Sequence, residues 1–141
     1  MIHYLDTSAL VKRYVQEAGS ASVRALFRGK SLATARVAYA EIAATLARLC
    51  REGALDETDR DAIYGRLDAD FAALTVVEIR ASLVRAVPDL VKRRPLRGYD
   101  AVHLAAALVL RDRGIAVTFW AADGALVDAA RAEGLRTTLV A

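Results

Sequence analysis

The chain is poor in the residues that stabilise small secreted proteins or build zinc sites. Its 141 residues include a single cysteine, Cys50, which excludes an internal disulfide and a cysteine-based zinc site. The apolar neighbours of Cys50 indicate a buried thiol rather than a nucleophile. Proline occurs twice, and the few aromatic residues (6%) are scattered without a paired motif. The chemistry of the chain must therefore come from other side chains.

Long apolar runs are absent as well. The first six residues, Met-Ile-His-Tyr-Leu-Asp, reach an acidic residue too early for the apolar region of a secretory signal. The most apolar stretch, residues 101–110, contains His103 and is far shorter than the roughly 20 residues needed to span a bilayer. We therefore expect a soluble cytoplasmic protein with no membrane partner.

The composition is that of one packed domain. Hydrophobic residues make up 55% of the chain and charged residues 26%, which is enough apolar sequence for a sizeable core. The length predicts a single domain over residues 1–141. A formal net charge of +3 permits a nucleic-acid partner without requiring one.

Hydrophobic periodicity predicts alternating strands and helices. Short apolar or β-branched runs indicate strands at 2–5, 31–35, 74–79, 115–120 and 136–140. Helical spacing, caps and glycine stops predict helices at 20–28, 37–51, 56–71, 98–113 and 123–133. A further helix is predicted to begin at Asp6-Thr7-Ser8. Another is predicted to follow the third strand and reach about residue 92, with Pro88 as a break or kink. This alternation predicts an α/β fold with a central, mostly parallel, twisted sheet of four or five short strands and helices on both faces.

Two acidic residues come directly after predicted strands. Asp6 follows the first strand, and Asp123 follows the strand that ends near Trp120. In open α/β sheets, ligands bind at the carboxyl ends of the strands. Glu41 and Asp100 lie early in apolar helices that would pack on the sheet. If both helices begin at the same edge, the four carboxylates converge.

Convergent carboxylates favour a divalent cation. Like charges raise one another's pKa, so four bare carboxylates in close contact need a counter-charge. Hard oxygen ligands without cysteine or paired histidine indicate Mg²⁺ or Mn²⁺ rather than zinc. An ion bound between carboxylates and a phosphodiester would activate a water molecule and stabilise the leaving oxygen, so no protein nucleophile is required.

Each acid also has a purely structural interpretation. Asp6, Asp100 and Asp123 stand where acidic residues commonly cap a helix or complement its dipole. Glu41 lies on a polar stripe that includes Thr45 and is typical of a solvated helix face. Taken singly, none of the four positions decides between the two interpretations.

The sequence motifs around the four acids resemble those of the PIN-domain family, and within it those of the VapC-type toxins. The segments that carry the resemblance are LDTSALVK at 5–12, AEI at 40–42, YDAVHLAAA at 99–107, and AD at 122–123 with AA at 129–130 and GL at 134–135. They run in order over essentially the whole chain, and the first and third are the specific ones. The resemblance implies the PIN-like fold.

The resemblance also implies the activity and its residues. It implies that one or two Mg²⁺ or Mn²⁺ ions serve RNA hydrolysis and are held by Asp6, Glu41, Asp100 and Asp123. Ser8 matches a hydroxyl that supports the metal site by contacting the metal ligands rather than the ion itself. Ala121 departs from the family, in which many relatives carry Thr or Ser before the fourth acid, and this puts the role of Asp123 in doubt. The implied partners are RNA, a second copy in a homodimer, and a small antitoxin whose tail enters the acidic groove.

Basic residues and histidines complete the candidates. The densest basic cluster comes just before the Asp100 helix and fits either contacts to RNA phosphates or a solvated loop: Lys92, Arg93, Arg94 and Arg97. His103 lies three residues after Asp100 on nearly the same helical face, and a packed, hydrogen-bonded structural role is favoured over that of a general base. His3, in the first strand, is also expected to be structural.

Two other functions fit the same sequence. One is an RNA-binding or assembly module that keeps the fold without catalysis, although the presence of all four acids counts against it. The other is a phosphotransferase or phosphatase with Asp6 as nucleophile, but such enzymes usually carry a second acid two positions later, where this chain has Ser8. The leading hypothesis remains a metal-dependent endoribonuclease, and the RNA that it would cut is not named by the sequence.

Overall fold

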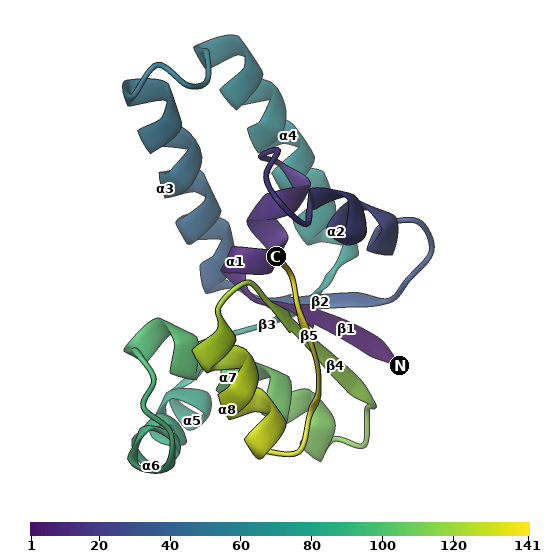
Figure 1. The fold of residues 1–141 in the computed structure, drawn as a ribbon, viewed down its shortest axis with the longest axis vertical. Coiled ribbons are helices and arrows are strands. Elements are labelled where there is room, and N and C mark those ends of the chain that lie inside the picture. Colours follow the sequence, from purple (N-terminus) through teal and green to yellow (C-terminus); the bar gives the residue numbers. More distant parts are fainter.

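The computed structural model describes residues 1–141 and shows one sheet between two layers of helices (Figure 1). All four pairs of neighbouring strands are parallel, in the order β3-β2-β1-β4-β5. The strands are β1 (Ile2–Leu5), β2 (Leu32–Ala35), β3 (Thr75–Val77), β4 (Val117–Ala121) and β5 (Arg136–Leu139). The predicted α/β class and five strands are confirmed, although β3 is shorter than the expected 74–79.

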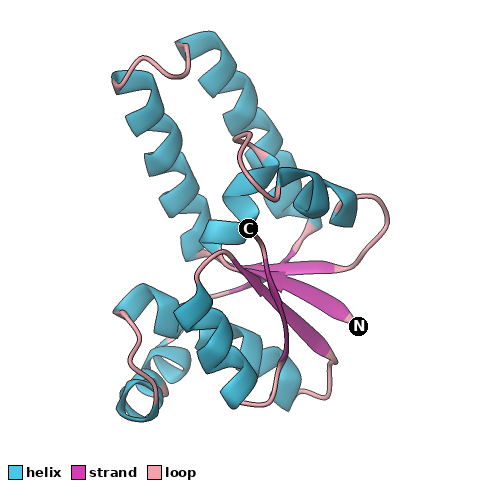
Figure 2. Ribbon diagram, in the orientation of Figure 1, coloured by secondary structure: helices cyan, strands magenta, loops and turns pink.

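Helices cover both faces of this sheet (Figure 2). They are α1 (Thr7–Leu10), the short 3-10 helix η1 (Val11–Arg13), α2 (Ser20–Leu26), α3 (Val37–Arg51), α4 (Glu57–Ala73), α5 (Ala81–Arg85), α6 (Val87–Arg93), α7 (Gly98–Asp112) and α8 (Gly124–Ala132). The helix expected to reach residue 92 is divided at Ala86 into α5 and α6. Pro88 lies in the first turn of α6, where its missing N–H leaves no helical bond unmade. None of the helices is both long and apolar enough to cross a membrane.

The central strand β1 divides the core into two apolar clusters. Ile2 and Tyr4 belong to the cluster that includes α7 and α8, whereas Leu5 belongs to the one formed with α1 to α4. This alternation follows from the period of two along a strand. Both faces of this central strand are therefore buried, as is typical of a parallel sheet covered by helices.

The carboxyl ends of β1 and β4 lie side by side. Leu5 pairs with Trp120, and the backbone N–H of Asp6 donates to the carbonyl oxygen of Trp120 at 3.1 Å. The chain therefore leaves both strands at one edge of the sheet. α3 and α4 lie side by side and extend beyond this edge as a helical hairpin (Figure 1).

Candidate active site

Three of the four predicted acids line one cleft at the carboxyl edge of the sheet. Asp6 comes from the β1–α1 junction, Glu41 from the second turn of α3 and Asp100 from the first turn of α7. We call this cavity of about 380 Å³ the acidic cleft. Its wall also includes Thr45 and Arg48 of α3, so the polar stripe around Glu41 faces the cleft.

Asp6 is buried, with 3% of its surface exposed. Its Oδ1 accepts hydrogen bonds from the backbone N–H of Ala9 at 3.0 Å and from Ser8 Oγ at 2.7 Å. Burial, together with the nearby charge of Asp100, raises the pKa of Asp6 to about 6 against the partial compensation from these bonds and from His103. Asp6 thus caps α1 with one oxygen and still lines the cleft, so its structural and functional interpretations are compatible.

Ser8 connects Asp6 to the neighbouring strand. Its hydroxyl donates to Asp6 Oδ1 and accepts a hydrogen bond from the backbone N–H of Ala122 at 2.9 Å. Ala122 lies in the turn between β4 and α8. Ser8 is therefore positioned to orient the carboxylate of Asp6 relative to the end of β4.

Asp100 is half-buried and lacks a neutralising partner. Burial raises its pKa, and the negative charge of Asp123 adds to that shift, while His103 and Arg97 oppose it. Asp123 itself lies outside the cleft and caps α8, because its Oδ1 accepts from the backbone N–H groups of Ala125 at 2.8 Å and Leu126 at 3.3 Å. The structure brings together Asp6, Glu41 and Asp100 and leaves Asp123 close enough to act on Asp100 through its charge.

Glu41 is held by two side chains that the sequence did not identify as its partners. Thr7 Oγ1 donates to Glu41 Oε1 at 2.7 Å, and His103 Nε2 lies 3.2 Å from the same oxygen. Burial acts to raise the pKa of Glu41, but these two hydrogen bonds outweigh it and the pKa is lowered. Glu41 is therefore held as an anion in the cleft.

The expected packing of His103 is observed: 1% of its surface is exposed and both ring nitrogens have partners. Its contact with Glu41 was not expected, although the spacing of three residues from Asp100 was the available signal. His3 accepts a hydrogen bond from Trp120 Nε1 at 3.0 Å, as a structural residue does. Cys50 is only half-buried, in contrast to the expected buried thiol.

The donor set of the acidic cleft suits a hard divalent cation. Both hydrogen bonds that Asp6 accepts end on Oδ1, and no salt bridge neutralises Asp6 or Asp100. No three His, Cys, Asp or Glu side chains are grouped closely enough to form a complete ligand set. Mg²⁺ typically keeps several of its waters and binds through one or two carboxylates, so the residues present fit such an ion.

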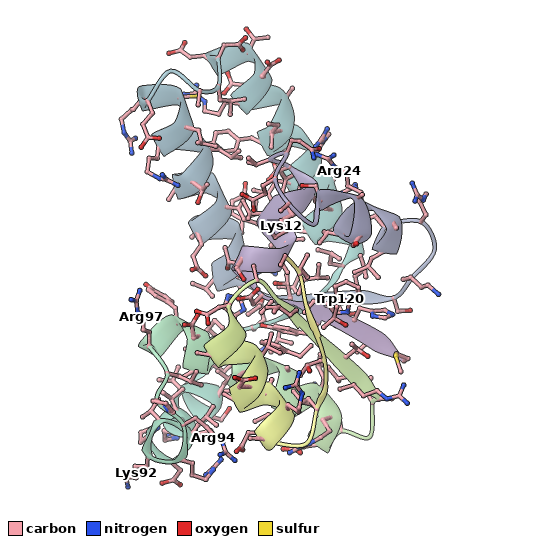
Figure 3. The ribbon with its side chains drawn as sticks, viewed as in Figure 1. Lys12, Arg24, Lys92, Arg94, Arg97 and Trp120 are labelled. Atoms are coloured by element: carbon pink, nitrogen blue, oxygen red, sulfur yellow. The ribbon has the colours of Figure 1, made fainter.

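The predicted basic cluster does not act as one group. Arg93 and Arg94 both pair with Glu133, at 2.8 and 2.9 Å, and Lys92 lies 3.7 Å from Asp89. Figure 3 shows Lys92 and Arg94 around α6, apart from Arg97. Only Arg97, at the start of α7, affects the pKa of Asp100.

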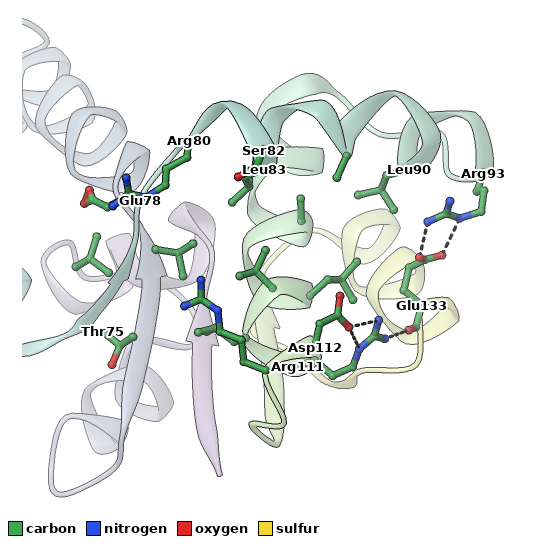
Figure 4. A pocket seen from close by; sticks show the side chains of 18 residues that line it. Thr75, Glu78, Arg80, Ser82, Leu83, Leu90, Arg93, Arg111, Asp112 and Glu133 are labelled. Carbon is green, nitrogen blue, oxygen red and sulfur yellow. Dashed lines mark hydrogen bonds and ion pairs between the residues drawn. The ribbon is translucent and has the colours of Figure 1, made fainter.

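A larger cavity of about 570 Å³ lies between β3, α5, α6 and α7 (Figure 4). It contains none of the four predicted acids. Arg111 pairs there with Asp112 at 3.1 Å, and Arg93 with Glu133. Most of its charges therefore neutralise each other, and its size alone gives no reason to place the chemistry there.

The chain is similar in sequence to a family of known proteins. Residues 3–120 match the PIN domain family. Ribonuclease VapC45 of Mycobacterium tuberculosis (strain CDC 1551 / Oshkosh) is 37% identical over 134 residues, which cover 94% of this chain and 92% of that relative.

Two solved structures share the fold. Mycobacterium tuberculosis VapC20, described as a sarcin-ricin loop cleaving toxin, has a TM-score of 0.63 and 21% identity over 94% of this chain and 95% of its own. A toxin-antitoxin complex from Klebsiella pneumoniae has a TM-score of 0.60 and 14% identity over 86% of both chains. PIN-domain ribonucleases generally depend on a divalent metal. With a family match over most of its length and a relative of this identity, the chain belongs to the PIN-domain family and, within it, to the VapC ribonucleases.

Proposed function

We propose that this protein is an endoribonuclease that uses Mg²⁺ or Mn²⁺ and acts as the toxin of a toxin–antitoxin pair. The observation that carries the proposal is the acidic cleft, where Asp6 and Asp100 have raised pKa values and no cationic side chain as partner. Perturbed carboxylates that converge in a cleft are typical of functional sites. The 37% identity to a ribonuclease supports the same conclusion.

The residues of the cleft have separate tasks in this proposal. When bound, a divalent ion supplies an activated water and neutralises charge that develops on the phosphodiester. One or two of the carboxylates of Asp6, Asp100 and Glu41 would hold it directly and the rest through its bound waters, and Ser8 would keep Asp6 in place. Asp123 would add negative charge at the rim of the cleft.

The partners follow from the same site. An RNA backbone carries negative charge that the acidic cleft repels, so a cation near the start of α7, such as Arg97, would favour its approach. We include a small antitoxin that occupies the acidic cleft, a homodimer and a cytoplasmic location in the proposal. The fold shared with a chain of the Klebsiella pneumoniae complex supports the antitoxin partner.

The decisive experiment compares two carboxylates on the same helix. Asp100→Asn removes a charge from the cleft, whereas Asp112→Asn removes an exposed one at the other end of α7. We expect Asp100→Asn to lower the rate of RNA cleavage at least about 100-fold, since even outer partners of metal sites contribute 10- to 100-fold. Asp112→Asn should cleave normally.

Cleavage should also stop with EDTA and return with Mn²⁺. Circular dichroism of each variant checks that the fold is retained. Cleavage that survives both EDTA and the Asp100 substitution would contradict a metal-dependent mechanism. RNA binding without turnover in Mn²⁺ would instead support the non-catalytic module.

A further inference from the structure

We propose that Tyr4, Thr7 and His103 form a buried hydrogen-bonded chain that fixes one tautomer of His103 and positions Glu41 in the acidic cleft. The inference deepens the proposed function and rests on it where Glu41 is taken to serve the site. The three residues are positioning residues, because they would act through Glu41. Their arrangement itself is a property of the metal-free protein and can be tested without any reaction.

The chain of contacts runs from the core to the cleft. Tyr4 Oη lies 2.8 Å from His103 Nδ1, and His103 Nε2 lies 3.0 Å from Thr7 Oγ1 and 3.2 Å from Glu41 Oε1. Thr7 Oγ1 donates to the same carboxylate oxygen at 2.7 Å. Tyr4 belongs to β1, Thr7 to α1, Glu41 to α3 and His103 to α7, so the contacts join four elements.

The directions of these hydrogen bonds determine where the protons lie. A hydroxyl has one proton, and that of Thr7 goes to Glu41. The contact between Thr7 and His103 therefore requires Nε2 of His103 to donate. In a neutral imidazole the other nitrogen, Nδ1, is then an acceptor, and the hydroxyl of Tyr4 donates to it. Every hydroxyl and N–H in this network has an acceptor only if His103 is the neutral Nε2–H tautomer, whose single N–H is shared between Thr7 Oγ1 and Glu41 Oε1.

The end of the hydrogen-bonded chain that lies in the core is rigid. Tyr4 has no exposed surface and stacks on Phe119, with 5.4 Å between ring centroids and 8° between the ring planes. His103 is packed against Tyr4 with the rings edge to face, 5.9 Å apart. The donor that reaches the cleft therefore starts from a fixed point in the core rather than from a mobile surface group.

The end of the hydrogen-bonded chain that reaches the cleft restrains the flexible side chain of Glu41. Glutamate has three side-chain torsions, and both hydrogen bonds to Glu41 end on Oε1. Oε2 is thereby left for another ligand, as is Oδ2 of Asp6. Partners of this kind orient a metal ligand, and their loss typically weakens metal binding about 10- to 100-fold.

The first test reads the tautomer directly in metal-free protein. The chain has two histidines, so a His3→Gln variant leaves His103 as the only imidazole in a long-range ¹H–¹⁵N spectrum. We expect the shifts of an Nε2–H tautomer. In the same background Tyr4→Phe should keep the Nε2–H tautomer, whose acceptors remain, but shift the ¹⁵N resonance of Nδ1, because Nδ1 loses its donor while the aromatic ring remains. A dominant Nδ1–H form before this substitution would overturn the inference.

The second test measures Mn²⁺ affinity by calorimetry on two matched pairs. Tyr4→Phe is compared with Tyr14→Phe, which removes a buried hydroxyl bonded to Asp70 outside the cleft. Thr7→Val is compared with Thr7→Ser, which keeps the hydroxyl. We expect affinity about tenfold weaker for Tyr4→Phe and Thr7→Val and nearly unchanged for the other two.

The outcomes separate this inference from the proposed function. Wild-type Mn²⁺ affinity in both Tyr4→Phe and Thr7→Val, with binding lost in Asp100→Asn, would overturn the positioning role and leave the metal site standing. Unchanged Mn²⁺ binding in Asp100→Asn would overturn the proposed function instead. Circular dichroism of each variant checks that the fold is retained before its Mn²⁺ affinity is compared with that of the wild type.

Discussion

The acidic cleft and the cluster of Arg13, Tyr14 and Asp70 both keep carboxylates out of water, but they compensate the charge differently. Asp70 accepts from Arg13 Nε at 2.6 Å, from Arg13 Nη2 at 3.1 Å and from the Tyr14 hydroxyl at 2.6 Å. This fork of charge-assisted bonds joins η1 to α4. Asp6 is more deeply buried and has only a hydroxyl and one backbone N–H as donors.

The difference separates a structural carboxylate from one kept for a ligand. A buried charge that serves stability is paired, because an uncompensated one is unfavourable in a low-dielectric interior. Asp6 is stabilised incompletely, and its pKa is raised as a result. In the cleft, the missing positive charge is what a bound cation would provide.

Removing the charge of Asp70 should have the largest effect on stability. Asp70→Asn keeps the shape but leaves Arg13 without its counter-charge, and the pair is mostly shielded from solvent, with 14% and 26% of the side chains exposed. We expect the free energy of unfolding to fall by about 3 kcal/mol, near the lower end for broken buried pairs. Urea denaturation measures it. An unchanged midpoint would show that the pair contributes no stability.

Removing the charge of Asp6 should have the opposite effect and raise the free energy of unfolding at neutral pH. The pKa of Asp6 is about 6 in the folded protein and 3.8 as the reference value, so the folded state binds this proton more tightly. The contribution of Asp6 to the free energy of unfolding therefore falls as pH rises through this interval. Between about pH 4.5 and pH 7.5 the decrease is on the order of 2 kcal/mol.

Asp6→Asn should abolish this dependence of stability on pH and stabilise the metal-free protein at neutral pH. Urea denaturation in EDTA at several pH values, with the wild type as the reference, gives the difference directly. Identical pH profiles for the two proteins would mean that Asp6 titrates normally. Excess Mn²⁺ should reverse the order of stability, because only the wild type retains this ligand.

The smallest effects are expected for the basic residues. Arg97→Ala should weaken RNA binding and lower the slope of log affinity against log salt by about one, as expected for one lost phosphate contact. Arg94→Ala should change the slope less, because its guanidinium already pairs with Glu133. Filter binding in EDTA across a salt series measures both slopes, and a larger change for Arg94 would restore the original view of one continuous basic cluster.

Much of the fold could be predicted because its signals are local. Alternating apolar runs and helix caps identify the strands and most helices within a few residues. The position of Asp6 and Asp123 after strands, and of Glu41 and Asp100 early in helices, was enough to expect convergence at one edge. The division of one predicted helix into α5 and α6 was anticipated at Pro88 only as a break or kink.

By itself, the sequence determined the α/β class, the family and the acids of the cleft, because periodicity and motif spacing are read along the chain. Only the tertiary structure decided which charges are neutralised. Arg93 and Arg94 reach Glu133 about 40 residues away, and His103 reaches Glu41 across 62. These contacts depend on how the helices pack on the sheet, and the sequence pattern along the chain does not show which distant residues are brought together.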